Sequence, residues 1–584
     1  MSKPFERNRL KRRYLYFGIG SYALIVLFFC HWGHLVQSAP ELSGASLALE
    51  AVNHLVFHPF QFFPFDTAYL AYGMLIGLIA PLMIQTEYLR RRDLRPAIEN
   101  GSAKWNENLK DYQKRYISTP LLGTGSQNMI FAQQLYLSMD TRKTLRNNNV
   151  MVIGGSGTGK SRFFVMPNLL QANCSFVVTD PSGELLETMG AFLEAEGYEI
   201  RVFNLVQMEH SDAYNPFSYI HKQEDVLVMV DALIKNTTPS GSRSSDPFWE
   251  KAETALLTAI CFYVLAQEEP LHTFAAVMYF LRQAAAEEGE TSTLDKVFEA
   301  FAKANPDHIA VTSYAVYKSA GGGKTAQSIL ISCQTRLQMF NLDAVQALTS
   351  TDTLDLGSIG DKKVALFCIT PTGNTTFNFL VSMMYTQLFE TLYHHAETEC
   401  PGKRLKYPVR FLLDEFSNVG TIPNFCQKLA TMRKYEISCS IVLQALSQIK
   451  SLYKDEWDVL IANCDSLLFL GCQDSTTLEF ISKSLGKETI RTMSSSRSFG
   501  RSGGSSVSYN KTGRELMTPD ELRTMDNKHC IYFLRGLAPF FARKYDLKSH
   551  PNFSRCAAGG GPSYDVAQEK HTPNWRQTDD KSTT

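Results

Sequence analysis

The chain has 584 residues, of which 44% are hydrophobic and 20% are charged. This length is too great for one hydrophobic core, so we expect several structural units, and the composition is that of a globular protein. The 58 basic and 58 acidic residues give no formal net charge, which excludes nucleic-acid binding through a global positive field and leaves only local contacts.

The cysteine pattern excludes a zinc-finger type of site. The 12 cysteines are scattered singly, without a C-x-x-C pair. We expect them to be small, buried apolar residues in a reducing compartment. His394 and His395 have no HExxH frame and no cysteine pair nearby, so no metal site is expected there.

Residues 1–95 have the pattern of a membrane anchor. Residues 14–33 contain no Asp, Glu, Lys or Arg, and residues 67–84 form a second uncharged run that Pro81 interrupts. Such runs are typical of membrane spans, because a central charge costs about 2.5–3.5 kcal/mol. Two alternatives compete: a cleaved signal peptide for the first run, and a core helix for the second. The first run is longer than the apolar region of a signal peptide, which is about 7–15 residues.

Basic residues flank both runs. They are Lys3, Arg7, Arg9, Lys11, Arg12 and Arg13 before the first run, and Arg90, Arg91, Arg92 and Arg95 after the second. The intervening residues 34–66 contain no Lys or Arg. By the positive-inside rule, this asymmetry predicts two spans with both chain termini in the cytoplasm.

An apolar run at residues 150–153 is followed at once by the pattern G-x-x-x-x-G-K-[ST]. The run is typical of the buried strand before a phosphate-binding loop. Glycines allow backbone N–H groups to surround the phosphates, Lys160 would contact the β- and γ-phosphates, and Ser161 would hold Mg²⁺. The sequence predicts a nucleotide site formed by Gly154, Gly155, Ser156, Gly157, Thr158, Gly159, Lys160 and Ser161.

The segments after this loop alternate between strands and helices. A second apolar strand, within residues 174–185, ends in Asp180, and a third lies around residues 200–205. This alternation predicts an α/β fold with a parallel sheet and helices on both faces. From 224 to 319 the apolar spacing is helical without a convincing strand, so we expect an inserted all-α domain.

Strand signals then return, at KKVALFCITP, VRFLLDEF, CSIVLQA, DSLLFLGC and KHCIYFLRG. The nucleotide-binding domain is therefore expected in two parts, 96–223 and 320–556. The segment GGGKT at 321–325 resembles a second P-loop, but no apolar strand precedes it, which favours a junction turn. The Ser/Gly-rich residues 493–513 predict a mobile loop. Residues 557–584 lack apolar periodicity and predict a disordered tail.

The segment VRFLLDEF, residues 409–416, has the form of a strand ending in two carboxylates. Asp414 could coordinate the Mg²⁺ held by Ser161, and Glu415 would polarise the attacking water. The alternative for a lone Asp-Glu pair is a strand-terminating turn, which the upstream P-loop disfavours. Arg410 interrupts the apolar strand, and we expect it at an exposed or partner-facing position.

Two further polar residues are candidates for catalysis. Gln444 closes the strand CSIVLQA and could contact the γ-phosphate or its water; the alternative is an ordinary glutamine at a strand end. Arg433 is expected on the helix before that strand. In a ring of subunits, an arginine there can enter the neighbouring site, an effect of about 10³–10⁵ in rate. The alternative is a solvated arginine at a helix end.

Taken together, these motifs resemble the type IV secretion system coupling proteins, the TraG-type ATPases of conjugative transfer. The similarity covers nearly the whole chain and includes the two N-terminal runs, GGSGTGKSRFFVMPNL, VVTDPSGEL, DPFWEKAETALL, LLDEFSNVG, ATMRKYEIS, LQALSQ and FFARKYD. The resemblance implies a RecA-like P-loop NTPase domain with an inserted all-α domain, preceded by two transmembrane helices. By position, Lys160 and Ser161 match the family's Walker A motif, and Asp414 and Glu415 match its Walker B motif. Arg433 matches the family's arginine finger and Gln444 its glutamine sensor. Ser182 stands where the family commonly has Lys.

The resemblance also implies a function. The chain would be an ATPase, with ATP and Mg²⁺ as cofactors, that is anchored in the bacterial inner membrane and assembles as a homo-hexamer. It would couple DNA bound to its relaxase, the relaxosome, to the inner-membrane components of a type IV secretion channel during conjugation. Two alternatives stay open: an adaptor that recruits protein effectors without handling DNA, and a septal chromosome-segregation pump, which two spans disfavour.

Overall fold

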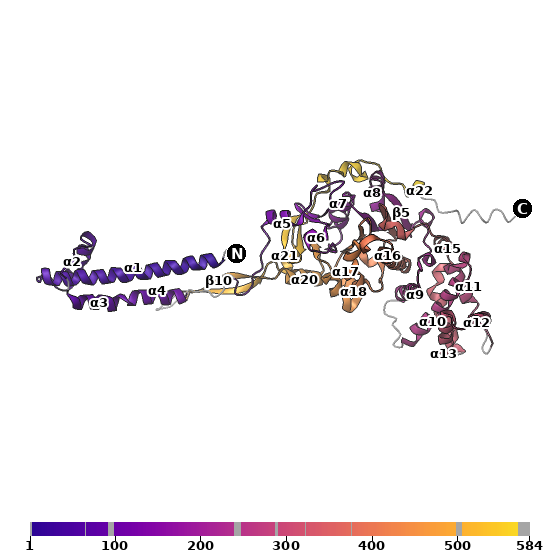
Figure 1. The fold of residues 1–584 in the computed structure, drawn as a ribbon, viewed down its shortest axis with the longest axis horizontal. Coiled ribbons are helices and arrows are strands. Elements are labelled where there is room, and N and C mark those ends of the chain that lie inside the picture. Colours follow the sequence, from indigo (N-terminus) through magenta and orange to yellow (C-terminus); the bar gives the residue numbers. More distant parts are fainter. Residues whose placement is uncertain are drawn as a thin grey trace. The chain divides into compact units, whose positions relative to one another are not determined.

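The computed structural model divides the chain into two units (Figure 1). One unit comprises Met1–Gly101 and Thr489–Gly513, and the other comprises Ser102–Glu488 and Arg514–Thr584. The sequence did not predict that Thr489–Gly513 belongs to the same unit as the N-terminal residues. The described residues are 3–64, 66–90, 98–238, 247–285, 290–321, 323–374, 376–497 and 505–569.

Four helices form the N-terminal part of the first unit. They are α1 Lys3–Ser38, α2 Gly44–Phe57, α3 Thr67–Gly77 and α4 Ile79–Arg90. By length and composition, Arg13–Ser38 and Thr67–Glu87 could each cross a membrane, and they contain the two expected spans. The helix breaks between α3 and α4 because Pro81 has no N–H to donate to the Gly77 carbonyl. Three arginines of the expected cytoplasmic flank lie outside the described residues: Arg91, Arg92 and Arg95.

Helix α3 packs closely against α1 through glycines spaced G-x-x-x-G. A Cβ added to Gly73 would lie 2.8 Å from the Cβ of Phe29, and one added to Gly77 would lie 3.1 Å from the Tyr22 ring. Small residues at this spacing allow two helix backbones to approach, which is the main source of helix association in a bilayer. The two glycines therefore hold the helical hairpin together.

We expect Gly73→Leu to weaken this hairpin by about 1–3 kcal/mol, the usual cost of overpacking. The measurement is the SDS fraction at which Trp32 fluorescence changes in the detergent-solubilised chain, with the other four of its five tryptophans replaced by Phe. Gly20→Leu is the matched control, because nothing lies within 4 Å of a Cβ at that position. Equal midpoint shifts in the two variants would contradict the close-packing argument.

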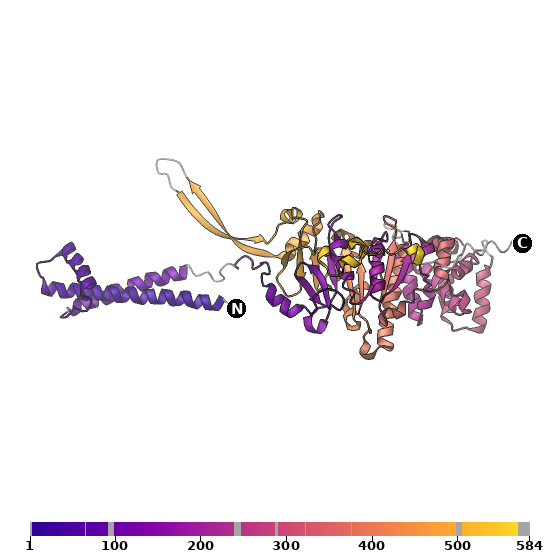
Figure 2. The ribbon, with the colours of Figure 1, turned by 90° about the horizontal axis from the view of Figure 1, so that it is seen from above.

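The segment predicted as a mobile loop, 493–513, is instead largely strand. Strands β10 Lys487–Arg497 and β11 Ser505–Glu515 pair as a two-stranded sheet (Figure 2), and residues 498–504 lie outside the described part. Serine and glycine content suggested mobility, but Val507, Tyr509 and Thr512 are residue types that favour strands. The loop prediction was therefore wrong for the described residues.

A nine-stranded sheet organises the described part of the second unit. Its order is β13-β12-β9-β3-β8-β7-β4-β6-β5. The strands from β9 to β5 are parallel to their neighbours, whereas β12 is antiparallel to both β9 and β13. The bounds are β3 Val150–Ile153, β4 Ser175–Pro181, β5 Glu199–Asn204, β6 Val364–Thr370, β7 Val409–Leu413, β8 Ile437–Leu443, β9 Ser466–Phe469, β12 His529–Leu534 and β13 Phe540–Arg543. A separate antiparallel pair consists of β1 Asn128–Ala132 and β2 Leu135–Ser138.

Helices cover both faces of the large sheet. On β3, Met151 and Ile153 belong to one hydrophobic core, and Val150 and Val152 belong to another, because successive side chains of a strand point to opposite faces. The first core includes α16 Asn378–Thr398, and the second includes α8 Glu184–Ala195. The predicted α/β fold with a parallel sheet and two helical layers is confirmed.

Seven helices lie between β5 and β6 in the described residues (Figure 1). They are α9 Gln223–Thr237, α10 Pro247–Leu265, α11 Phe274–Arg282, α12 Thr293–Ala304, α13 Ile309–Ser319, α14 Lys324–Arg336 and α15 Asp343–Ser350. The segment GGGKT leads into α14 and is preceded by a helix rather than a strand. Helices continue past residue 319 to Ser350, and the domain limits expected from the sequence stay a prediction.

The second unit contains further short α-helices in its described residues. They are α5 Leu109–Tyr116, α6 Thr141–Thr144, α7 Met166–Leu169, α17 Phe425–Thr431, α18 Leu446–Tyr453, α19 Trp457–Ala462, α20 Ser475–Leu485, α21 Pro519–Arg523 and α22 Val566–Glu569. Part of the predicted disordered tail is ordered: Tyr564 is buried, and its N–H donates to the Glu187 carbonyl at 3.0 Å. Tyr564 lies against Gly190, where an added Cβ would be 2.7 Å from the Tyr564 Cβ, and the Ser563 hydroxyl also donates to the Glu187 carbonyl. Residues 570–584 lie outside the described part.

Arg410 does not face solvent or a partner, so that expectation was wrong. Its side chain on β7 is 1% exposed. Its Nη1 donates to Asn168 Oδ1 at 2.8 Å, its Nη2 donates to Ser440 Oγ at 3.2 Å, and the guanidinium stacks over the Phe164 ring. Burial lowers the pKa of Arg410 to about 10. The hydrogen bonds and the ring compensate for lost hydration, and they tie the P-loop helix to the centre of the sheet.

Candidate nucleotide site

The P-loop lies between β3 and a short helix that begins with a π-helical turn, Ser161–Val165, and ends with α7. Its glycines are required by geometry. Gly159 has φ +82°, and a Cβ there would lie 2.5 Å from the Phe163 ring; a Cβ on Gly154 would lie 2.5 Å from the Thr158 Oγ1. A side chain at Gly159 is disfavoured by both its φ and the Phe163 ring, whereas at Gly154 the space alone is filled.

The Walker A and Walker B motifs meet at a direct contact. The Ser161 hydroxyl donates to Asp414 Oδ2 at 2.5 Å. Ser161 comes after β3 and Asp414 comes after β7, and these two strands lie on either side of β8 in the parallel part of the sheet. The other Asp414 oxygen, Oδ1, is buried and has no hydrogen-bond partner. A buried carboxylate oxygen without a donor, beside a serine hydroxyl, is the oxygen ligand set that Mg²⁺ prefers. These residues therefore fit the divalent ion that the sequence predicts.

Opposing effects act on the pKa of the Asp414 carboxylate. Burial raises the pKa of Asp414, while the hydrogen bond from Ser161 and the charge of Lys160 act in the opposite direction. Lys160 is itself buried, with its Nζ 3.5 Å from the Gly155 carbonyl oxygen. An ammonium held over the loop in this way lies where the phosphates of a nucleotide would bind.

Glu415 and Gln444 are paired. Gln444 Nε2 donates to Glu415 Oε1 at 2.7 Å, and Asn418 Nδ2 donates to Oε2 at 3.3 Å. Glu415 has φ +52°, a conformation that non-glycine residues seldom adopt and that is typical of functional positions. The left-handed residue turns the chain at the end of β7, and its carboxylate is held beside the end of β8. The predicted base and sensor are therefore in contact.

Arg433 lies elsewhere. It is exposed on the 3₁₀ turn Met432–Tyr435, and its Nη2 donates to the Thr141 carbonyl at 3.1 Å. It lines a cavity of about 310 Å³ with Asn148 and Pro408, which come just before β3 and β7. This cavity is at the amino ends of the strands, whereas the Walker residues are at the carboxyl ends. Arg433 is therefore not part of the nucleotide site of its own chain.

Two further residues act on this site: Asp180, which the sequence predicted only as the end of a strand and whose charge interacts with that of Asp414, and Lys544, which the sequence did not single out. Asp180, at the end of β4, accepts hydrogen bonds from the N–H groups of Leu185 and Leu186, and burial raises its pKa to about 7. Lys544, just after β13, donates from Nζ to the P-loop carbonyl of Thr158 at 2.8 Å. Burial lowers the pKa of Lys544 to about 8. The acidic turn after an apolar strand could have signalled Asp180, but no local pattern signals Lys544.

We expect Lys544→Met to weaken nucleotide binding by about 10-fold, because a hydrogen bond to a charged group contributes about 1.5–3 kcal/mol and here it fixes the loop. Methionine keeps the buried stem and removes only the donor. The measurement is a titration with a fluorescent nucleotide. Lys528→Met, an exposed lysine on the same edge of the sheet, is the control, and equal affinities for both variants would contradict this role.

Comparisons with known proteins agree with this geometry. A family model described as "Type IV secretory system Conjugative DNA transfer" matches residues 106–558. The chain belongs to this family. It is a coupling protein of conjugative DNA transfer, as the matched family and its VirD4 and TraG relatives together show.

The relatives of this coupling protein are distant in sequence. Protein VirD4 of Rhizobium radiobacter is 23% identical over 527 residues, covering 86% of this chain and 72% of the relative. Conjugal transfer protein TraG of Escherichia coli is 23% identical over 413 residues, covering 65% and 61%. The conjugative coupling protein TrwB, solved with sulphate, has a TM-score of 0.56 at 16% identity over 77% of this chain and 96% of that one. The coupling protein therefore has the TrwB fold.

Proposed function

We propose that this coupling protein is an ATPase that uses ATP and Mg²⁺ at the site described above. The observation that carries the proposal is the contact between Ser161 and Asp414, with the buried Asp414 Oδ1 directed at no donor. Lys160 would hold the phosphates, and Glu415 would accept the proton of the attacking water. Bound Mg²⁺ would supply charge neutralisation at the phosphates. A TrwB structure in complex with ADP and Mg²⁺ supports this assignment of cofactors.

We further propose which substrate, assembly and membrane anchor this coupling protein uses. The chain would deliver a relaxase with its bound DNA to the inner-membrane components of the secretion channel, as a homo-hexamer. The two apolar helical segments would anchor it in the bacterial inner membrane with both termini in the cytoplasm, which the basic flanks support. The helices between β5 and β6 would form the domain that recognises the relaxosome, with the nucleotide-binding domain on either side of them in the sequence.

The adaptor alternative is tested by whether DNA changes hydrolysis. The full chain in detergent is assayed for ATP hydrolysis without polymer, with single-stranded DNA and with duplex DNA, first at low salt and then over a salt titration, because phosphate contacts weaken steeply with salt. We expect DNA to stimulate hydrolysis at low salt, and the stimulation to decline as salt rises.

Hydrolysis that is indifferent to both DNA forms would favour the adaptor. A Lys160→Ala chain that supports normal transfer from its host element would overturn the ATPase proposal itself, because Lys160 is the main contact to the phosphates in it. Crosslinking in cells that captures a protein effector but never a relaxase or DNA would also favour the adaptor.

A further inference from the structure

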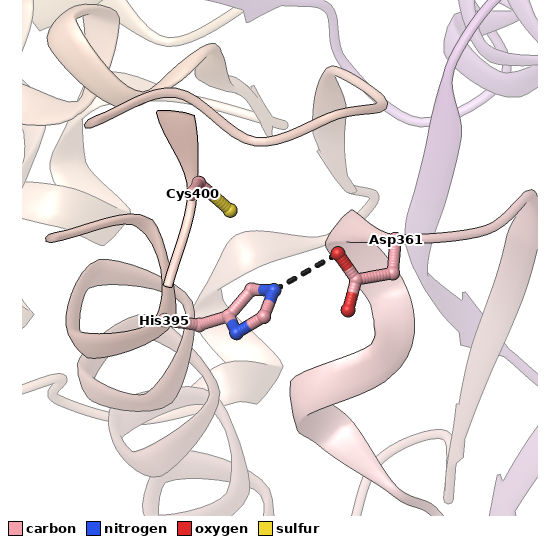
Figure 3. Close-up of side chains that lie close together, drawn as sticks. All are labelled: Asp361, His395 and Cys400. Atoms are coloured by element: carbon pink, nitrogen blue, oxygen red, sulfur yellow. Dashed lines mark hydrogen bonds and ion pairs between the residues drawn. The ribbon is translucent and has the colours of Figure 1, made fainter. Parts of the chain in front are cut away.

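Three side chains of types that bind metals lie close together near the amino end of β6, away from the carboxyl ends that carry the Walker residues. Asp361, in the turn before β6, lies beside His395 in the last turn of α16, and Cys400 follows the end of that helix. One ligand atom from each residue lies within 4.8 Å of the other two (Figure 3). The sequence argued against a metal site at His395 because no cysteine pair was near, but the fold supplies one cysteine and one carboxylate instead.

The backbone shapes this group. The N–H of Cys400 donates to the His395 carbonyl at 3.2 Å, so the chain closes the end of α16 and returns the thiol toward the imidazole. The Nε2 of His395 is 2.9 Å from Asp361 Oδ1, and the thiol points to the same space (Figure 3). Two segments that are separated by the whole of β6 and α16 thus present sulfur, nitrogen and oxygen donors to one another.

A fourth residue completes the arrangement. The Nδ1 of His395 is 3.1 Å from Glu399 Oε2. A metal-ligating histidine nearly always donates its second ring nitrogen to a carboxylate or carbonyl, which fixes the ring and its tautomer. His395 has Nε2 on the ligand side and Nδ1 beside Glu399, so Nδ1–H can donate to that carboxylate when Nε2 binds a metal. The His395 side chain is 14% exposed and the Asp361 side chain is 48% exposed, so a water molecule can reach a fourth position.

We propose that Asp361, His395 and Cys400 bind a zinc ion, with Glu399 orienting the histidine. A mixed sulfur, nitrogen and carboxylate set with tetrahedral spacing is typical of Zn²⁺, whereas Mg²⁺ takes oxygen ligands. Zinc bonds of about 2.0–2.3 Å place tetrahedral ligand atoms about 3.3–3.8 Å apart. The Cys400 thiol, within 4.8 Å of the other two ligand atoms, therefore approaches by up to about 1 Å, while His395 Nε2 and Asp361 Oδ1, which are 2.9 Å apart, separate by about 0.5 Å to admit the ion. The ion fastens the turn before β6 to the end of α16, away from the carboxyl edge that holds the Walker residues.

The test uses the full chain in detergent, stripped with a chelator and titrated with Co²⁺ as a spectroscopic substitute for zinc. We expect one equivalent of Co²⁺ to give the thiolate-to-cobalt charge-transfer band, and one equivalent of Zn²⁺ to remove it. An oxygen-only site such as the one at Asp414 gives no such band. Cys400→Ser and His395→Asn should each lower the affinity by more than about 100-fold, and Glu399→Gln by about 10–100-fold.

His394→Asn is the matched control. It changes the same residue type one position earlier on α16, where the ring stacks on His221 at 4.9 Å instead of facing Asp361, and it should keep the band. If Cys400→Ser fails to fold, Asp361→Asn, which keeps the thiol, takes its place. The proposal is overturned if no band forms in the unaltered chain, or if the band survives unchanged in Cys400→Ser or Asp361→Asn. His395 then only bridges two carboxylates by hydrogen bonds.

Discussion

Glu415→Gln is expected to reduce ATP hydrolysis by about 10²–10⁴-fold while nucleotide still binds, because a general base contributes about that much. The glutamine keeps the size of the side chain and its contact with Gln444, which is 2.7 Å away, but it cannot accept the proton of water. Single-turnover hydrolysis measures the rate, and a fluorescent-nucleotide titration measures binding.

Two further variants test this prediction, one as a control and one with a smaller expected loss of hydrolysis. Glu456→Gln, an exposed glutamate on the loop after α18, should have no effect. Gln444→Ala should give a smaller loss than Glu415→Gln, because Asn418 still donates to the carboxylate. Equal rates for Glu415→Gln and the unaltered chain would remove Glu415 from the mechanism.

Arg433→Ala is expected to lower hydrolysis by about 10³–10⁵-fold, the usual effect of removing an arginine finger. Arg433 lines a cavity at the amino ends of the strands, far along the sheet from the carboxyl ends that carry Ser161 and Asp414. Its charge can therefore act on phosphate only at a neighbouring chain. Lys434→Ala, on the same exposed turn, is the control and should be near normal.

Mixing two inactive variants separates action between chains from action within one. A site of an Arg433→Ala chain keeps its own Glu415, and a Glu415→Gln neighbour supplies the missing arginine. Random assembly at equal amounts should restore roughly a quarter of the sites in a head-to-tail ring. If mixing restores nothing while each variant alone still assembles with the unaltered chain, Arg433 does not act on a neighbouring site.

The sequence predicted the parts of the site that are built locally. The P-loop and the Asp-Glu end of β7 are patterns of adjacent residues, and their meeting follows from the rule that parallel strands end at one edge of a sheet. Lys544 could not be predicted, because it reaches Thr158 across 386 positions of sequence and depends on where β13 pairs.

Burial and pairing account for the errors. A charged residue in a strand is usually exposed, but Arg410 is buried because Asn168 and Ser440, from two other elements, accept its hydrogen bonds. The Ser/Gly-rich stretch was predicted as a loop from composition alone. It forms strands because the residues of β10 pair with those of β11, which composition does not show. The burial of Arg410 and the pairing of β10 with β11 both depend on contacts between residues that are not adjacent in the sequence.

The position of the helical insertion determines how substitutions within it can affect the hydrolytic residues. The seven helices leave and rejoin the sheet through β5 and β6 at its edge. Strand β4 lies between β6 and the end of β7, where Glu415 is held. A shorter route exists beside the sheet: Asn236 on α9 accepts a hydrogen bond from the Thr421 N–H and donates to the Thr421 carbonyl, and Thr421 follows soon after Glu415 in the chain. Substitutions in these helices can therefore reach the turn that holds Glu415 without passing through β4 and β6, and Asn236 is the position where we expect such coupling.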